Sequence, residues 1–191
     1  MIIHFYLHLL KKNICVFCSS NNLIADCYKN AAFHLGESIA ENDHALVYGG
    51  ATGGLMTSVA KGAHSKGGEI IGVITQSIVK MNRLSPVLSQ TIYVNSLAER
   101  KAEMKKLTDI FIVLPGGYGT MDEMFDVVAS GTLGEHRKPL IIINENGFYN
   151  PLLEQMALFK KENCIPKQES YQIEIVQDVD QCIERIINPN I

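Results

Sequence analysis

Short runs of β-branched and other apolar residues alternate along the chain with longer segments of helical periodicity. The runs predict strands at 13–18, 45–48, 69–74, 91–94, 110–114, 139–143 and, more weakly, 172–176. Between them, periodicity and end signals predict helices at 27–41, 54–66, 97–107, 119–132, 149–162 and 179–187. Two of the strands, 110–114 and 139–143, are almost continuously apolar, which indicates a sheet covered on both faces. The pattern therefore predicts an α/β fold, a doubly wound parallel sheet of about seven strands between helical layers.

Length and charge mainly exclude some classes of function, such as nucleic-acid binding and membrane association. The 191 residues carry a net charge of -3 that is spread along the sequence, so we expect no nucleic-acid binding. The apolar run at residues 1–10 is about half the length that crosses a bilayer, and its lysines follow it, which is the wrong order for a signal peptide. We expect an N-terminal extension at 1–12, one domain at 13–191, no membrane association and a cytoplasmic location.

The five cysteines and six histidines suggest no metal site or disulfide framework. Cys15 and Cys18 lie in a predicted buried strand, so we interpret them as reduced core thiols; a redox pair is the alternative, although such pairs normally lie at a helix start. The histidines have no ligand spacing. We therefore expect neither a metal nor a cofactor.

Glycines and small polar residues gather where three predicted strands end. These positions are Ser19, Ser20 and Asn21 after the first strand, Gly49, Gly50, Gly53 and Gly54 after the second, and Pro115 to Thr120 after the fifth. In doubly wound sheets, ligands bind beyond the carboxyl ends of the strands, where the strand order reverses. The helix that starts near Gly54 also lacks a capping side chain, which indicates the close approach of another group.

The segment from Leu114 to Glu123 has the features of a phosphate cradle. Its three glycines, Gly116, Gly117 and Gly119, precede a helix, and the unpaired N–H groups of a helix start bind anions. Thr120 and Glu123 also have the spacing of a capping box, which would close the helix without a ligand. We place Glu123 in the first helical turn, where the helix dipole favours the ionised carboxylate.

The predicted helix at 97–107 precedes the strand that leads into this loop. Its apolar stripe is Leu97, Met104 and Leu107, and Arg100 and Lys101 fall on the same face. They either snorkel over the core edge or reach the glycine loop, where a guanidinium suits a phosphate or carboxylate. The remaining charged positions, Glu99, Glu103, Lys105 and Lys106, are interpreted as ordinary surface.

These residues together resemble the LONELY GUY (LOG) family, once mislabelled as lysine decarboxylases. The resemblance rests on Arg100-Lys101-x-x-Met104, Asp109 and the Pro-Gly-Gly-Tyr-Gly-Thr-x-x-Glu segment that ends at Glu123, and it extends over most of the chain. It implies a Rossmann-like homodimeric enzyme that hydrolyses a nucleoside 5′-monophosphate to free base and ribose 5-phosphate. It implies Arg100 and Glu123 as catalytic residues and, as substrate-binding residues, Ser20, Gly49, Gly50, Lys101, Gly116, Gly117, Tyr118, Gly119 and Thr120.

The chain departs from the family where the base is recognised. Asn21, Asn82 and Ala129 replace a serine, a substrate-binding glutamate and a threonine of plant members. AMP therefore competes with N6-substituted AMP, the cytokinin nucleotide, as the substrate. Two further hypotheses remain open: a nucleotide or molybdenum-cofactor carrier of the same fold, and a lysine decarboxylase, for which no lysine has a recognisable pyridoxal-phosphate context.

Overall fold

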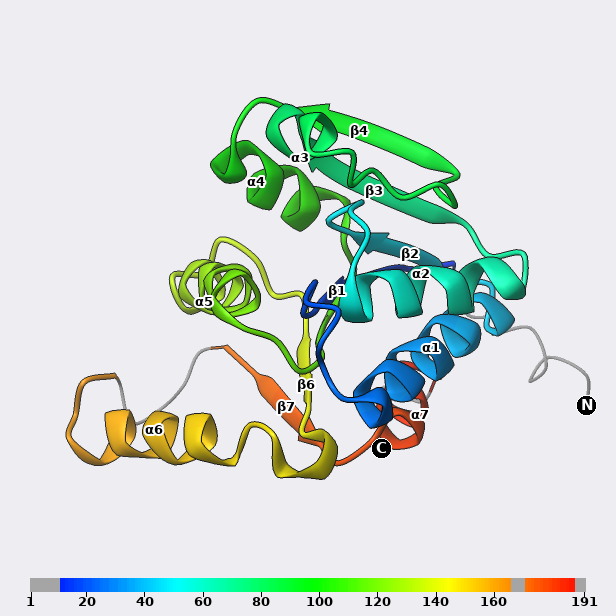
Figure 1. Cartoon of the computed structure of the whole chain (residues 1–191). Coiled ribbons are helices and arrows are strands. Elements are labelled where there is room, and N and C mark those ends of the chain that lie inside the picture. Colours follow the sequence, from blue (N-terminus) through cyan, green and yellow to red (C-terminus); the bar gives the residue numbers. More distant parts are fainter. Residues whose placement is uncertain (1–10, 166–170, 188–191) are drawn as a thin grey trace, which may run out of the picture.

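The protein is described here by a computed structural model that covers residues 11–165 and 171–187. Within them, seven parallel strands form one sheet in the order β4-β3-β2-β1-β5-β6-β7 (Figure 1). The strands are β1 (Asn13–Phe17), β2 (Ala45–Tyr48), β3 (Ile70–Thr75), β4 (Gln90–Val94), β5 (Ile110–Val113), β6 (Leu140–Ile143) and β7 (Ile173–Val176). The predicted doubly wound sheet is confirmed.

The helices connect these strands. They are α1 (Asp26–Glu41), α2 (Gly54–Ser65), α3 (Gln76–Lys80), α4 (Leu97–Leu107), α5 (Tyr118–Thr132), α6 (Asn150–Lys161) and α7 (Val179–Ile187), with a 3₁₀ turn η1 (Glu145–Gly147). Every predicted element is confirmed to within one residue at each end. The sequence analysis missed α3 and η1, because five residues with no buried side chain and three residues around a left-handed Asn146 show no periodicity.

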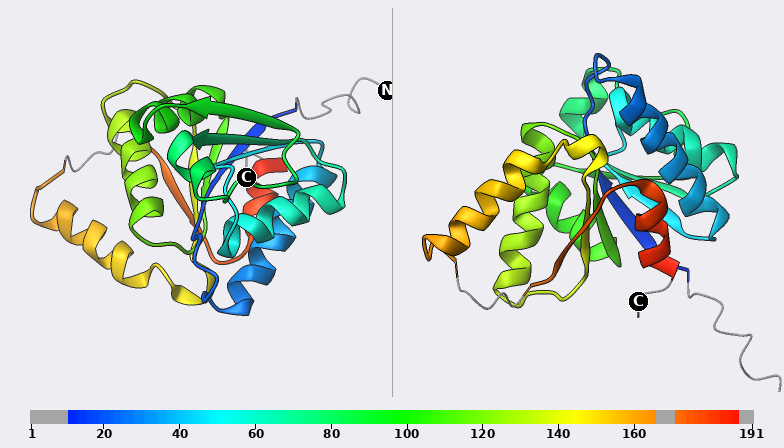
Figure 2. Two further views of the ribbon diagram at one scale, coloured as in Figure 1. Left: turned by 45° about the horizontal axis from the view of Figure 1, so that its top comes forward. Right: turned by 90° about the horizontal axis from the view of Figure 1, so that it is seen from below.

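Two apolar cores lie on opposite faces of the sheet (Figure 2). The side chains of β1 alternate between them: Ile14 and Val16 face α1, α2 and α7, whereas Cys15 and Phe17 face α4 and α5. All four residues of β5 and of β6 are buried. This double coverage is the reason that the strands are apolar at every position, as the sequence predicted.

The beginning of the described chain contacts its last helix. Residues 1–10, which form most of the expected N-terminal extension, lie outside the described residues. Lys12 precedes β1 and donates from Nζ to the carbonyl oxygen of Ile186, 3.2 Å away. Every helix in the described ranges is too short or too polar to cross a membrane.

Helices α1 and α2 approach each other so closely that only glycine fits at two crossing points. A Cβ added to Gly62 would stand 2.0 Å from the carbonyl oxygen of Phe33, and one added to Gly36 would stand 2.1 Å from that of Val59. Contacts of that length are impossible for carbon and oxygen. The two helices therefore form one tightly packed layer.

We expect Gly62→Ala to destabilise the protein, although alanine is the better helix former by about 1 kcal/mol. The added methyl group forces α1 and α2 apart, and overpacking of this kind costs about 1–3 kcal/mol. Urea unfolding monitored by circular dichroism measures the change. Lys61→Ala, on the exposed side of the same helix, is the control and should stay within about 0.5 kcal/mol. Equal stability of the two variants would contradict the close packing.

Candidate active site

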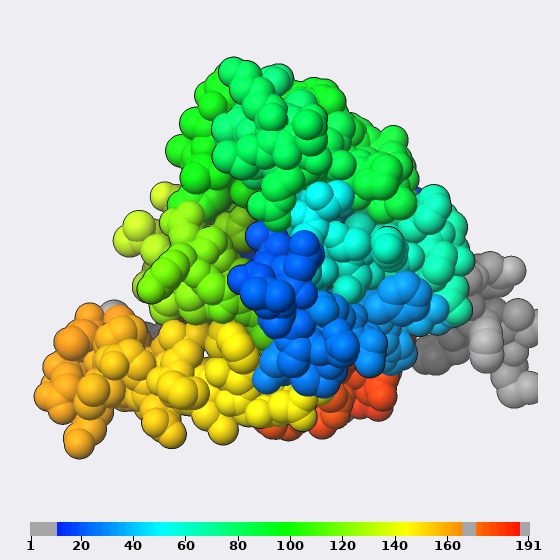
Figure 3. All heavy atoms as spheres, viewed as in Figure 1, coloured from blue at the N-terminus to red at the C-terminus, as the bar shows by residue number. Residues whose placement is uncertain are grey.

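A cavity of about 370 Å³ opens at the carboxyl ends of β1, β2 and β5. The sheet order reverses between β1 and β5, because β2 to β4 lie on one side of this pair and β6 and β7 on the other. The loop after each of the three strands contributes to the lining, including Ser20, Gly49 and Gly117. In Figure 3 the blue segment around residue 20 meets the green middle part of the chain at the centre of this face. The predicted convergence of the three loops is confirmed.

Two glycine-opened helices point toward this region, and only one keeps its N-terminal donors available. At α2, Gly54 N donates to Asn22 Oδ1 at 2.8 Å, and Leu55 N donates to the Ser19 carbonyl oxygen at 2.9 Å. Gly53 N donates to Thr57 Oγ1 at 2.6 Å. The close approach predicted at this helix is therefore that of the chain's own β1–α1 loop.

At α5 no side chain caps the N-terminus. The first bond of the helix runs from Met121 N to the Gly117 carbonyl oxygen at 3.0 Å, so the N–H groups of residues 118–120 precede the helical ladder. A Cβ added to Gly117 or Gly119 would meet no heavy atom within 4 Å. This helix start is open to an anion.

The capping box considered for Thr120 and Glu123 does not form. The helix starts at Tyr118, with Gly117 as N-cap, so Thr120 is its third residue and Glu123 its sixth. Thr120 is buried against Gly116, where an added Cβ would stand 2.1 Å from Thr120 Oγ1. The placement of Glu123 in the first turn is also wrong, because the helix begins too early for it.

A capping arrangement exists instead at α4. Glu99 N donates to Ser96 Oγ at 3.1 Å, and Glu99 Oε2 accepts from Asn95 N at 2.8 Å. Glu99 is therefore more than the ordinary surface residue that we predicted, because it fixes the start of the helix that carries Arg100.

Arg100 and Glu123 form a nearly buried ion pair in the cavity wall. Arg100 Nη2 donates to Glu123 Oε1 at 2.8 Å, and each side chain is 12% exposed. The guanidinium lies against Gly49, where a Cβ would stand 2.0 Å from Nη2. Arg100 Nε is buried and has no partner among the described residues. The pair thus joins α4 to α5 beyond the carboxyl end of β2.

Burial raises the pKa of Glu123, and the neighbouring Arg100 lowers it again in part. The dipole argument, which favoured the ionised carboxylate, is therefore wrong in its direction. It assumed a first-turn position at the surface, whereas Glu123 lies in the second turn and is desolvated. Arg100, and to a smaller extent Lys101, favour the charged form by lowering the pKa of Glu123.

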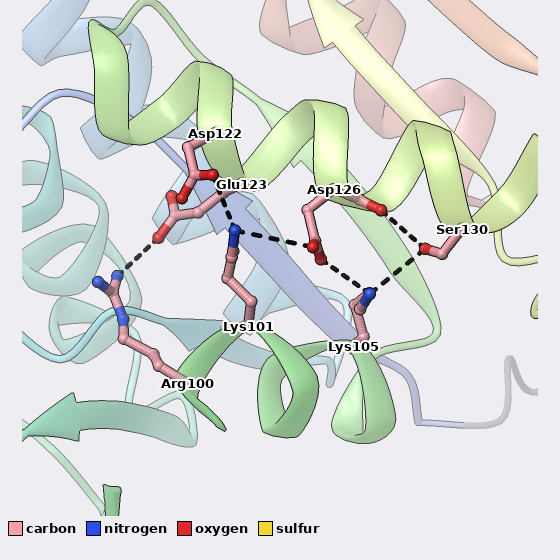
Figure 4. A network of polar contacts seen from close by, with 7 residues as sticks. All are labelled: Arg100, Lys101, Lys105, Asp122, Glu123, Asp126 and Ser130. Atoms are coloured by element: carbon pink, nitrogen blue, oxygen red, sulfur yellow. Dashed lines mark hydrogen bonds and ion pairs between the residues drawn. The ribbon is translucent and has the colours of Figure 1, made fainter. Parts of the chain in front are cut away.

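Lys101 is not among the residues that line the cavity. Its Nζ lies 2.8 Å from Asp122 Oδ1 and 3.7 Å from Asp126 Oδ1, both on α5 (Figure 4). Lys105, predicted as ordinary surface, lies 2.8 Å from Asp126 Oδ2. The predicted apolar stripe of α4 is also only partly right: Met104 is buried, but Leu97 is 58% exposed. Leu107 is partly buried and packs with Met104 against the core, so both apolar and charged contacts hold this helix.

The other predicted site residues divide into two groups. The residues that line the cavity are Ser20, Gly49, Gly117, Tyr118, Gly119 and Thr120, together with Arg100 and Glu123. The residues outside the lining are Gly50, Lys101 and Gly116. Gly50 has a positive φ of 66° and packs against Gly72, so it forms the turn behind Gly49.

Arg83 is a charged lining residue that sequence reasoning missed, as it did the apolar Ala51 and Ile78. Its Nη2 donates to the Thr52 carbonyl oxygen at 2.6 Å, and Ser85 N donates to the Gly50 carbonyl oxygen at 2.9 Å. The segment that follows β3 is thus tied along the β2–α2 loop. Arg83 could have been predicted from its position after a parallel strand, where ligands bind. The sequence analysis did not predict α3, however, and named Asn82 in this segment instead.

Three other groups near the site have structural explanations. Cys15 and Cys18 are buried free thiols, as predicted, and burial raises the pKa of both. His136, a family position without an assigned task, lies 3.0 Å from the Val127 carbonyl oxygen through Nε2 and contacts the rings of Phe111 and Tyr171. No cluster of three metal-ligating side chains occurs in the described part of the chain.

Comparison with known proteins identifies relatives at the level of sequence. A family model described as "Possible lysine decarboxylase" matches residues 56–186. The chain is 35% identical over 175 residues to the probable cytokinin riboside 5′-monophosphate phosphoribohydrolase LOGL2 of Oryza sativa subsp. japonica, covering 92% of this chain and 72% of the relative. It is 40% identical to the phosphoribohydrolase LOG5 of Arabidopsis thaliana, covering 74% of this chain and 62% of the relative. The chain thus spans about two thirds of the length of these relatives.

Solved structures support the fold. A molybdenum cofactor carrier protein from Chlamydomonas reinhardtii superposes with a TM-score of 0.71 at 20% identity, over 94% of this chain and 98% of the other. A molybdenum cofactor binding protein from Rippkaea orientalis gives 0.69 at 22% identity, over 95% and 98%. At these identities the likeness extends to the fold alone. The family match and the sequence relatives together show that this chain belongs to the LONELY GUY family.

Proposed function

We propose that the protein hydrolyses the N-glycosidic bond of a purine nucleoside 5′-monophosphate, AMP or an N6-substituted AMP, to free base and ribose 5-phosphate. The observation that carries this proposal is a nearly buried Arg100–Glu123 pair in the same cavity as an uncapped helix start. Relatives named as cytokinin riboside 5′-monophosphate phosphoribohydrolases support the same reaction. The departures at Asn21, Asn82 and Ala129 leave AMP and its N6-substituted form as the two candidate substrates.

In this proposal the 5′-phosphate binds at the start of α5. The N–H groups of residues 118–120 point out of the helix end, and the helix dipole adds to their attraction for an anion. Gly117 and Gly119 leave room for phosphate oxygens to approach the backbone. The charged residues of the lining are Arg83, Arg100 and Glu123, so the cavity carries net positive charge. All three features favour a phosphorylated ligand.

Glu123 is the proposed catalytic carboxylate. Cleavage of a ribosyl bond passes through a state in which positive charge develops on the sugar, and a carboxylate stabilises that charge or activates water. The water oxygen forms the new bond to C1′, and the C1′–N bond breaks. The electron pair of that bond leaves with the base, which takes up the proton that the water releases. Burial raises the pKa of Glu123, and the adjacent Arg100 lowers it in part and so favours the ionised carboxylate. Apolar lining residues Val16, Met56 and Ile78 offer surface for the purine ring.

Two alternatives are separated from this proposal by experiment. A carrier for a phosphorylated ligand such as the molybdenum cofactor would use the same helix start, but it has no need of a buried carboxylate held by an arginine. A lysine decarboxylase needs a lysine that binds pyridoxal phosphate, and the described cavity lining contains none. Mass spectrometry of ligands retained on the native protein distinguishes a molybdopterin from AMP or ribose 5-phosphate.

Assembly, location and domain limits complete the proposal. The family resemblance supports a homodimer, whereas the expected cytoplasmic location and single domain over residues 13–191 rest on the sequence itself. Light scattering on the purified protein measures the dimer directly.

We expect purified protein to release free base from AMP or from N6-isopentenyl-AMP, and Glu123→Gln to reduce turnover by about 10³-fold. The amide removes the charge but still accepts from Arg100, so the free energy of unfolding should change by less than about 2 kcal/mol. Chromatography of the released base and urea unfolding measure the two effects. Glu135→Gln, at an exposed position beyond α5, is the control. A folded protein that releases base from neither nucleotide would refute the proposed function.

Gly119→Ala separates a phosphate cradle from a structural glycine. The methyl group meets nothing in the protein, and alanine favours the helix, so stability should stay equal or rise by up to about 1 kcal/mol. KM for the nucleotide should rise about tenfold, equivalent to about 1.4 kcal/mol, because the methyl group obstructs the phosphate. Inhibition by ribose 5-phosphate should weaken in parallel. An unchanged KM would place the phosphate elsewhere.

The pH dependence follows from the raised pKa of Glu123. The ionised carboxylate is the active form, so kcat should rise with pH as Glu123 loses its proton and should fall below that pKa. The midpoint of this acidic limb is expected above 4.5, the ordinary value for glutamate, because burial outweighs the attraction of Arg100. Initial rates between pH 4 and 8 test it. A limb centred below 4.5 would show that Glu123 is not the titrating group.

A further inference from the structure

Helix α4, which carries Arg100, has little apolar attachment to the rest of the protein. Met104 is its one buried side chain among the described residues, and Leu97 at its start is exposed. Its outer surface is polar, as the pair between Lys106 and Glu103 on the same helix illustrates. The apolar packing of α4 is thus confined to Met104 and the partly buried Leu107, and a second kind of attachment joins the helix to α5.

That attachment is a row of charged contacts, which we call the α4–α5 clamp. Its members are Lys101 and Lys105 on α4 and Asp122, Asp126 and Ser130 on α5 (Figure 4). Lys101 Nζ lies 2.8 Å from Asp122 Oδ1, and Lys105 Nζ lies 2.8 Å from Asp126 Oδ2. Lys101 also lies 3.7 Å from Asp126, and Lys105 lies 3.4 Å from Ser130 Oγ. Two cations thus neutralise two anions.

The clamp continues the row of charged contacts between α4 and α5 that begins with the Arg100–Glu123 pair. Lys101 follows Arg100 in α4, and Asp122 precedes Glu123 in α5, so the first clamp contact is adjacent to the pair in both helices. Asp126 and Lys105 lie one turn further along their helices, where side chains share a face. The far end of α4 is fixed by Lys138, whose Nζ donates to the Lys105 carbonyl oxygen at 2.6 Å.

Three of the charged clamp residues are shielded from solvent, whereas Asp122 is 57% exposed. Lys101, Lys105 and Asp126 are between 21% and 28% exposed, whereas Lys106, which pairs within α4, is 77% exposed. Partly buried pairs are screened by salt less than exposed ones. Asp126 Oδ2 is itself buried. Loss of the Asp126 charge should therefore weaken the contacts between α4 and α5 more than loss of any other clamp charge.

We propose that the α4–α5 clamp is a positioning device that holds Arg100 on Glu123, with Asp126 at its centre. This inference rests on the proposed function for its kinetic consequences. It also changes the role of Lys101, which the family resemblance implied as a substrate contact: its ammonium pairs with Asp122 and Asp126 and is absent from the described cavity lining. In this role Lys101 acts on the reaction through Arg100.

Asp126→Asn tests the clamp, because asparagine keeps the shape and loses the charge. We expect kcat to fall about tenfold while KM changes by less than about twofold, since a small displacement of a catalytic group slows chemistry more than binding. Asp126→Glu, which restores the charge, should recover most of kcat. Lys106→Gln is the matched control and should leave kcat unchanged. A normal kcat in Asp126→Asn, or a Lys101→Gln variant that changes only KM, would overturn the proposal.

A second readout does not depend on catalysis. The charged groups that face Glu123 are Arg100 and Lys101 on α4 and Asp122 on α5, while β1 contributes the neutral thiols of Cys15 and Cys18. Loss of the Asp126 charge by itself would lower the pKa of Glu123, whereas displacement of Arg100 would raise it. We therefore expect carboxyl NMR titration of Asp126→Asn to show a higher pKa for Glu123 than in the wild type. An unchanged or lower pKa of Glu123 in Asp126→Asn would refute the clamp, whether or not the wild type is active. A wild type that is inactive on both nucleotides, together with a raised pKa in Asp126→Asn, would refute the proposed function but not the clamp.

Discussion

The strand order imposes the constraint on which the site depends. β1 and β5 are neighbours at the centre of the sheet, yet the helices that follow them leave toward opposite faces, α1 with one core and α5 with the other. The backbone must therefore diverge beyond the two strand ends, and a crevice forms there. Everything proposed for the chemistry lies in this crevice. Arg100 reaches it from α4 and Glu123 from α5, so the charge pair also spans the gap between separate elements.

The sequence predicted the elements well because their signals are local. Strands buried on both faces are apolar at every position, and glycines mark the turns where a phosphate or another backbone approaches. The combination of Arg100 with the Pro-Gly-Gly-Tyr-Gly-Thr segment also singled out Arg100 and Glu123, which line one cavity. What failed was the part of each inference that depends on distant residues. The pKa of Glu123 depends on how deeply α4 covers it, and no sequence pattern reports that depth.

The two glycine-opened helices show the same limit. Gly53-Gly54 and Gly117 to Gly119 both open helices at the predicted site, but the first helix start is occupied by Ser19 and Asn22 from another loop. Only tertiary structure distinguishes a donor that the chain itself uses from one that is left for a ligand. Arg83 was missed for a related reason, since its place at the cavity follows from pairing between the segment after α3 and the β2–α2 loop.

The glycine contacts between α1 and α2 have a consequence for motion. Gly36 and Gly62 bring these helices into backbone contact, and the β1–α1 loop in turn closes the start of α2. On this side of the crevice the two helices therefore have no room to move closer together. The opposite side is joined by charged side chains of α4 and α5 instead of backbone contact. The two walls of the crevice are therefore held by different forces, close packing of glycines on one side and partly buried ion pairs on the other.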